Sequence, residues 1–129
     1  MSERRQYRRR PDHFVVAVHL DLDTSGFTYD KWGGQQRCKQ GDWLVDNDGD
    51  VYTVDQDTFR RTYREVGRGR WVKSTPVWAE VAELAGTVKT KEGSTAYEAG
   101  DYLVFNEADG GDAYAVSRAT FESLYELDD

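Results

Sequence analysis

The stretch Gly41-Asp42-Trp43-Leu44-Val45 recurs later in the chain as Gly100-Asp101-Tyr102-Leu103-Val104. After each copy come a polar turn and a second short apolar run. Each copy then closes with a Thr-Phe pair and a tyrosine four residues after the phenylalanine. Self-similarity of this kind is the sequence signature of a repeated structural unit. We therefore expect two similar units within the 129 residues.

The pattern inside each unit predicts antiparallel strands, because short apolar runs rich in β-branched and aromatic residues alternate with glycine and aspartate turns. Asn47-Asp48-Gly49 predicts a tight hairpin turn. Asp55 or Asp57 could cap a short helix that places Phe59 and Tyr63 on one face. Thr120 could cap a second short helix over Phe121–Leu127, which ends the chain. The predicted fold class is α+β and mostly β. Each unit is expected to be a small curled sheet or open barrel closed by a short C-terminal helix.

The predicted domain organisation follows the repeat. Residues 1–10 are expected to be a flexible basic arm, 11–66 the first unit, 67–75 a linker and 76–129 the second unit. A unit of about 60 residues buries too little surface to be stable alone, so we expect the two to pack as a pseudo-dimer. Residues 21–31 are polar and predict a loop. Val77–Leu84 could form a strand or a helix, and the repeat favours a strand.

Composition limits the classes of function. The formal net charge is −7, and it is uneven: residues 1–71 carry 13 basic and 12 acidic groups, and residues 72–129 carry 4 and 12. The acidic body disfavours binding to duplex nucleic acid. No apolar run approaches the roughly 20 residues of a membrane helix, and no apolar signal segment follows the basic start. We therefore expect a cytoplasmic protein that does not enter a membrane.

The second unit resembles a group of small uncharacterised phage and bacterial proteins. These have a Pro-Val strand near the start, a Glu-Gly turn, a Gly-Asp-Trp/Tyr strand and a terminal Phe-x-x-x-Tyr helix. Pro76-Val77, Glu92-Gly93, Gly100-Asp101-Tyr102 and Phe121…Tyr125 carry the likeness. The first unit matches from Gly41, and departs from the pattern over residues 21–33. The resemblance implies a bacterial or phage origin and a role in phage–host conflict, and it implies no catalytic residues.

Several residues are candidates for a binding site. Asp42 and Asp101 could present carboxylates beside aromatic walls; the alternative is a structural role in which each carboxylate accepts backbone N–H groups at a bend. Trp32 and Trp71 lack an aromatic counterpart in the other unit, so we expect them to be exposed. Aromatic walls together with four cations could hold the base and phosphate of a nucleotide. These cations are Arg37, Lys39, Arg60 and Arg61.

Recognised catalytic and metal motifs are missing from the sequence. With Gly49 as the conserved glycine of a calcium loop, the first ligand position falls on Leu44, so that motif fails. His13 and His19 would lie about 20 Å apart on one strand, too far to share a metal. Cys38 has no obvious partner, which argues against a zinc site or a thiol nucleophile. We predict no cofactor, no metal and no enzymatic activity.

Three functions remain open from the sequence. The first is a non-catalytic protein-binding module, suggested by the repeat, the aromatic content and the uneven charge. The second is a small-ligand binder, such as a sensor or sponge for a nucleotide signal. The third and weakest is a hydrolase that uses two carboxylates. The basic arm could bind phosphates through its arginines and stack a base on Tyr7, although a solvated tail is the simpler interpretation.

Overall fold

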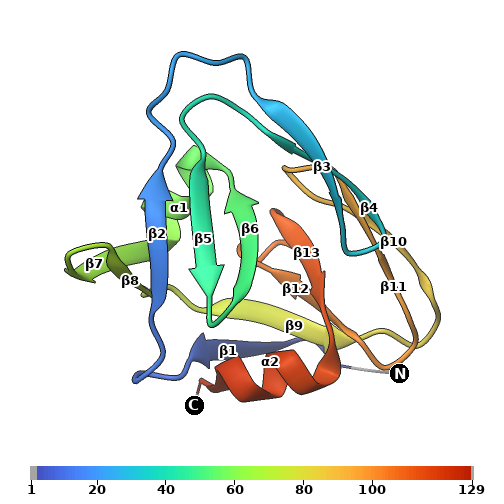
Figure 1. Ribbon diagram of the computed structural model, residues 1–129. Helices are drawn as coiled ribbons and strands as arrows, with labels where there is room; N and C mark the ends of the chain where they lie inside the picture. Colours follow the sequence, from blue (N-terminus) through green and yellow to red (C-terminus); the bar gives the residue numbers. More distant parts are fainter. Residues whose placement is uncertain (1–2, 129) are drawn as a thin grey trace.

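A computed structural model describes residues 3–128, which form two five-stranded antiparallel sheets, two separate hairpins and two short helices (Figure 1). The first sheet has the order β6-β5-β2-β8-β7, with bounds Asp50–Val54, Trp43–Asn47, Val15–His19, Arg70–Lys73 and Tyr63–Gly67. The second sheet has the order β13-β12-β9-β1-β14, with bounds Ala113–Val116, Tyr102–Phe105, Val77–Val81, Arg5–Arg9 and Tyr125–Leu127. The predicted fold class, α+β and mostly β, is therefore correct in its coarse form.

The hairpins and helices complete the element list. One hairpin joins β3 (Phe27–Lys31) to β4 (Gly34–Cys38), and the other joins β10 (Gly86–Lys89) to β11 (Ser94–Tyr97). The helices are α1 (Gln56–Thr62) and α2 (Arg118–Leu124).

The two sheets have corresponding strand orders. The strand in the fourth position of each sheet is directly followed along the chain by a strand of the other sheet. Strand β8 pairs with β2 and β7 in the first sheet, and the chain then passes to β9 in the second. Strand β1 pairs with β9 and β14 in the second sheet, and the chain then passes to β2 in the first. The registers match, since Trp71 lies opposite Val15 and Tyr7 lies opposite Val77.

Four expectations differ from the observed elements. Within the expected flexible arm of residues 1–10, Arg5–Arg9 forms a strand with a neighbour on both sides. The expected linker 67–75 contains β8. The loop expected at residues 21–31 contains β3. The helix expected over Phe121–Leu127 is displaced: α2 begins at Arg118 and ends at Leu124, and strand β14 follows it.

Other local predictions are confirmed. Asp48 and Gly49 have φ values of 53° and 95°, the left-handed conformation that a tight two-residue hairpin turn requires. The side chain of Asp55 caps α1 by accepting a hydrogen bond from the backbone N–H of Thr58. Val77–Val81 is a strand, as the repeat favours, and Glu92-Gly93 lies in the turn of a hairpin.

Each sheet packs its helix through a stack of aromatic rings. In the first sheet, Phe59 of α1 is fully buried and lies between Trp43 and Tyr63, with ring centroids 4.2 and 4.6 Å away. In the second sheet, Phe121 of α2 lies between Tyr102 and Tyr125, at 4.1 and 4.7 Å. The core of the protein is therefore two similar clusters, one under each helix.

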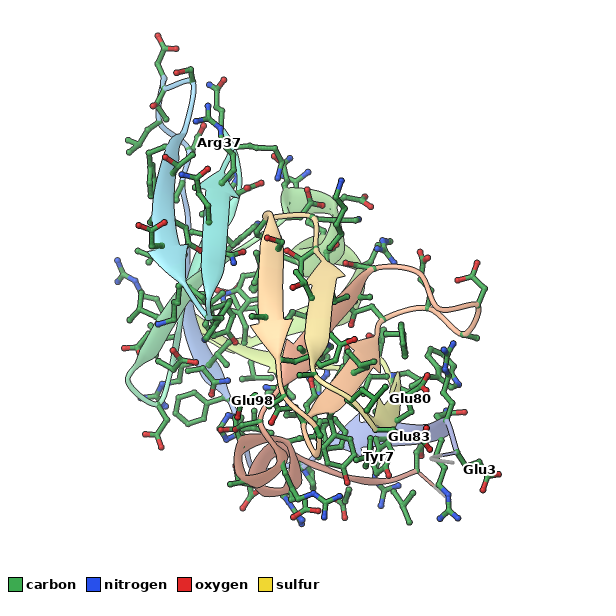
Figure 2. All side chains as sticks on the ribbon, turned by 90° about the vertical axis from the view of Figure 1, so that its right-hand side faces the viewer. Glu3, Tyr7, Arg37, Glu80, Glu83 and Glu98 are labelled. Atoms are coloured by element: carbon green, nitrogen blue, oxygen red, sulfur yellow. The ribbon has the colours of Figure 1, made fainter. Side chains whose placement is uncertain are left out.

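The two hairpins lie side by side, as both views show (Figures 1 and 2). The buried amide of Gln36 donates a hydrogen bond from Nε2 to the backbone oxygen of Ser94, 2.7 Å away. Gly34 and Gly93 lie at this contact, and a Cβ at either would collide with the backbone of the opposite hairpin. The hairpins thus form a second contact between the two parts of the chain, in addition to the strand pairings of β1 and of β8 described above.

Candidate functional site

A cavity of about 250 Å³ lies where the two sheets and the two hairpins meet. Most of its lining consists of residues at matching positions in the two sheets. These pairs include Asn47 and Asn106, Tyr52 and Tyr114, Thr58 and Thr120, Tyr63 and Tyr125, and Lys73 and Arg9. The hairpins contribute Trp32, Gln36, Thr90, Glu92 and Thr95. This concave, partly apolar cavity with several polar groups in its lining is the natural candidate for ligand binding.

Two cations line this cavity while being almost fully buried. Arg9, the last residue of β1, is 7% exposed, and Lys73, the last residue of β8, is 6% exposed. Among the residues that the structure describes, neither forms an ion pair with a carboxylate. Buried charges are normally paired, because removing an ion from water costs several kcal/mol.

Tyrosine side chains are the partners that these cations do have. Arg9 donates from Nη2 to the hydroxyl of Tyr125 at 3.0 Å and to that of Tyr63 at 3.5 Å. Lys73 donates from Nζ to the hydroxyl of Tyr114 at 3.1 Å. Both cations also lie over aromatic rings, with Arg9 4.8 Å from the ring centre of Tyr125. Within residues 3–128, Nε and Nη1 of Arg9 have no hydrogen-bond partner.

The positive potential changes the acidity of Tyr125. Burial opposes ionisation of this phenol, but the charges of Arg9 and Lys73, with hydrogen bonds from Tyr114 and Arg9, lower its pKa from 10.0 to about 7. Tyr114 is shifted the other way: burial, and then the nearby Tyr125, raise its pKa well above 10.0. Ionisation of Tyr125 to a phenolate would supply part of the missing negative charge.

A second group of polar residues lines the same cavity and accepts hydrogen bonds. Asp112 accepts from the hydroxyl of Thr58 at 2.7 Å, and Glu92 accepts from the backbone N–H of Asp55 at 2.7 Å. Oδ1 of Asn106 is buried without a partner. Burial is the main cause that raises the pKa of Glu92 from 4.5 to about 7. The cavity therefore has unpaired donors at one place and acceptors at another.

The two tryptophans expected to be exposed behave differently. Trp32 is 41% exposed, lines the cavity and packs against Tyr52 with ring centroids 5.2 Å apart. Trp71 instead packs edge-on against Trp43 and Phe59 in the core of the first sheet, at 5.0 Å from each. Trp71 lacks an aromatic counterpart only when the units are aligned from residue 11, because its structural counterpart is Tyr7.

Asp42 and Asp101 have the structural role given above as the alternative, in which the carboxylate accepts backbone N–H groups at a bend. The buried carboxylate of Asp42 accepts from the backbone N–H of Lys39 at 2.8 Å and from that of Gln56 at 3.1 Å. Asp101 accepts from the backbone N–H of Glu98 at 2.9 Å. Neither aspartate lines the cavity.

The four candidate cations lie outside the cavity lining. Arg37 donates to the backbone oxygen of Ser25 at 2.7 Å, on the outer part of hairpin β3–β4 (Figure 2). Lys39 forms ion pairs with Asp42 and Asp55. Arg60 is exposed on α1. Arg61 lies closest to the site, because it pairs with the cavity residue Asp112 at 3.4 Å.

Sequence reasoning missed the two buried cations, although a signal was present. Tyr7-x-Arg9 and Trp71-x-Lys73 have the same pattern of an aromatic residue followed two positions later by a cation. Alternation of this kind places both side chains on one face of a strand. The arginines around Arg9 hid the pattern and made the segment resemble a solvated basic tail.

Comparison with models of protein families, with curated proteins and with solved structures finds no match for this chain. Within residues 3–128, no helix is both long and apolar enough to cross a membrane. In the same range, no three His, Cys, Asp or Glu residues gather in a way that could hold a metal ion. The function must therefore be argued from the cavity itself.

Proposed function

We propose that this protein binds a small anionic ligand in the cavity between its two sheets, and that the chain consists of two copies of one unit that exchange their first strands. The observation that carries the proposal is Arg9, whose guanidinium is only 7% exposed and, within the described residues, has two nitrogens without hydrogen-bond partners. An anion in the cavity would accept from these nitrogens and neutralise the buried charge.

The size of the cavity supports a small ligand. A volume of about 250 Å³ corresponds to roughly eight water molecules at about 30 Å³ each. It lies below the 300–1,000 Å³ typical of pockets for drug-sized molecules. Trp32 and Tyr52 provide an aromatic wall beside the polar groups. Of the ligand classes suggested by the sequence, a compact anion fits better than a complete nucleotide.

The protein-binding hypothesis and the phage or bacterial origin stay predictions from the sequence, because no structural feature favours them in the way that the buried cations favour an anion. The units would need each other in this scheme, since each sheet takes its fourth strand from the neighbouring copy. The shared cavity then lies on the axis between the copies, which explains why its lining residues come in matching pairs.

Thermal unfolding in phosphate, sulfate and chloride at equal ionic strength tests the anion site. Sulfate and phosphate also stabilise proteins by exclusion from their surfaces, so the test compares variants. We expect phosphate or sulfate to raise the melting temperature of the wild type and of Lys89→Met, an exposed cation on β10, more than that of Lys73→Met. Equal shifts in all three proteins would overturn the proposal.

A further inference from the structure

The outer face of the first sheet, on the side away from α1, exposes a row of apolar side chains. In Figure 1 α1 lies behind β2 and β5, so this face is turned toward the viewer. Val16 and Val18 of β2 are 45% and 56% exposed, and the exposed Leu44 of β5 lies directly opposite Val18. Phe14, just before β2, and Val51 of β6 are also exposed. Contiguous apolar surface of this kind marks an interaction site.

The corresponding face of the second sheet shows that the fold does not require these apolar side chains. Glu80 of β9 takes the position of Val18, because each lies opposite the leucine of the repeated motif. Glu80 forms an ion pair with Arg4 at 2.7 Å, and the guanidinium of Arg4 also lies 4.0 Å from the ring centre of Phe105. The outer face of the second sheet is therefore covered by an arginine of the chain itself, whereas that of the first sheet is open.

Charges of opposite sign flank the apolar row on its two sides. In the sheet register Val16 lies opposite Asp46 of β5 on one side and opposite Arg70 of β8 on the other, so all three share the outer face. Farther out, Asp48 lies in the turn between β5 and β6, and Arg64 lies on β7. Within residues 3–128, none of these four charged residues forms an ion pair.

We infer that the outer face of the first sheet binds the same face of a second copy of this chain, about a two-fold axis that runs along β2. Rotation by 180° about this axis brings the acidic side of one copy against the basic side of the other. Arg70 of each copy then meets Asp46 of the other, because the two residues lie at the same level on either side of Val16. Val16 and Val18 lie on the axis and pack against their counterparts.

The shape of the face provides room for the arginine of the second copy. A hollow of about 450 Å³ lies beside the turn between β5 and β6, and its lining includes Phe14, Val16, Asp46 and Asp48. The apolar stem of an arginine would pack on Phe14 and Val16, and the carboxylates would accept from its guanidinium. Within one copy the guanidinium of Arg70 instead lies 5.3 Å from the ring centre of Phe14.

The area of the face sets the expected strength of the dimer. The sheet has five strands, and β2 is five residues long. At about 4.8 Å between strands and about 3.3 Å per residue, the sheet covers roughly 300 Å². Stable interfaces bury about 800 Å² of accessible surface per partner, so we expect a reversible dimer with a dissociation constant of about 10–500 µM.

Sedimentation equilibrium from about 10 µM to about 1 mM protein tests the inference across this range of affinity. We expect the wild type to dimerise reversibly. Val18→Lys places two ammonium groups together on the axis and should abolish the dimer over the whole range. Lys89→Asp, on the hairpin of β10 and β11, is the control for a change of net charge and should alter the dissociation constant by less than about twofold.

Exchange of the flanking charges makes the test specific to the two-fold arrangement. Arg70→Asp and Asp46→Arg should each weaken self-association at least tenfold, because like charges then meet twice in the dimer. An equimolar mixture of the two variants should associate as the wild type does, since every contact again joins opposite charges. Asp46 also accepts a hydrogen bond from the backbone N–H of Gly49 in the turn. If Asp46→Arg is unfolded by circular dichroism, the comparison of Arg70→Asp with Lys89→Asp decides.

The other outcomes overturn the inference. A chain that stays monomeric at the highest concentration leaves the outer face to a different protein. A dimer that persists in Val18→Lys, or charge variants that do not restore each other, would place the contact elsewhere on the molecule. The proposed anion site is unaffected by these results, because its lining in the first sheet includes Asn47, Tyr52 and Tyr63 of the opposite face.

Discussion

The first and second sheets share one strand order but differ in how the chain connects their fourth strand to the neighbouring strands. In the first sheet β8 is held by covalent connections at both ends, between β7 and β9. In the second sheet β1 leads into β2, and its neighbour β14 comes from the opposite end of the described residues. Each strand places an aromatic residue in a core and a cation in the cavity. The comparison shows that one architecture tolerates two chain connections.

The cations differ in how well the protein satisfies them. Lys73 is a compact ammonium that reaches one tyrosine hydroxyl, whereas Arg9 reaches two and still has two nitrogens without partners. A guanidinium has five N–H donors in a fixed plane, so it is harder to satisfy inside a protein than an ammonium. Of the two cavity cations, the one in the second sheet, Arg9, therefore has more N–H donors left for an anion to accept from.

The largest effect should come from deleting residues 2–10, which removes β1. Strands β9 and β14 would each lose a neighbour, and Phe121 would lose its contact with Tyr7. We expect a loss greater than about 5 kcal/mol, the lower end of the stability of natural domains, and no cooperative unfolding by circular dichroism. Deletion of residues 2–3 alone is the control and should unfold cooperatively. A melting temperature equal to that of the full chain would contradict the central role of β1.

The matching aromatic residues should be equally important in the two sheets. Tyr7 lies 4.9 Å from Phe121, and Trp71 lies 5.0 Å from Phe59, measured between ring centroids. Truncation of a large core side chain costs roughly 3–5 kcal/mol, and both residues are partly buried. We therefore expect Tyr7→Ala and Trp71→Ala each to cost about 3 kcal/mol by urea unfolding. Trp71→Phe, which keeps a ring, should cost less than half as much.

The double variant sharpens this comparison. The two residues belong to different hydrophobic clusters, so their effects should add to within about 0.5 kcal/mol. A much smaller cost for Tyr7→Ala than for Trp71→Ala would show that β1 is only loosely attached to the second sheet.

Substitutions in the repeated Gly-Asp motif should differ more between the two halves in their effect on the free energy of unfolding. Asp42 is buried and accepts two backbone N–H groups together with the ammonium of Lys39, whereas Asp101 is half-buried and accepts one N–H. Leaving buried donors unsatisfied costs about 1–3 kcal/mol each. We expect Asp42→Ala to lower the free energy of unfolding by about 3 kcal/mol and Asp101→Ala by about 1 kcal/mol. Equal costs would contradict the structural role assigned to the burial of Asp42.

The sequence predicted the local elements well because turns and caps are set by short-range chemistry. Asp48-Gly49 and the Asp55 cap follow from the conformations that those residues prefer. The crossing of β1 and β8 could not be predicted in this way, because strand pairing depends on contacts distant in the sequence. Arg9 shows the limit of local prediction. The composition of the segment around it resembles a solvated tail, and only its pairing with Tyr125 places it in the interior.

The candidate site was less predictable than the fold for the same reason. Of the chosen residues only Trp32 lines the cavity, since a single tryptophan without a repeated core role was a valid signal. Lys39 and Arg61 were chosen for their charge, but exposed charges form salt bridges with nearby acids and need no ligand. The cations to which the proposal assigns a ligand, Arg9 and Lys73, are buried, and burial is a property of the complete fold.

A further expected effect concerns the proton on Tyr125. Its pKa of about 7 lies below the ordinary value of 10.0, so the folded state favours the phenolate. This contribution to stability is complete above about pH 10 and is lost as the pH falls through about 7. The free energy contributed by Tyr125 should therefore rise with pH between these values. Ultraviolet absorbance of tyrosinate should show one phenol that ionises near neutral pH, absent in Tyr125→Phe and present in Tyr97→Phe.

An anion in the cavity should raise this pKa, because a second negative charge beside Arg9 and Lys73 competes with the phenolate. Anion binding should accordingly weaken as the pH rises through about 7, and Tyr125→Phe should remove this dependence. If phosphate binds with the same affinity at pH 6 and pH 8.5 after correction for its own ionisation, Tyr125 does not share the cations with the ligand. The anion would then occupy a part of the cavity away from Arg9, and the second sheet would lose its assigned role in binding.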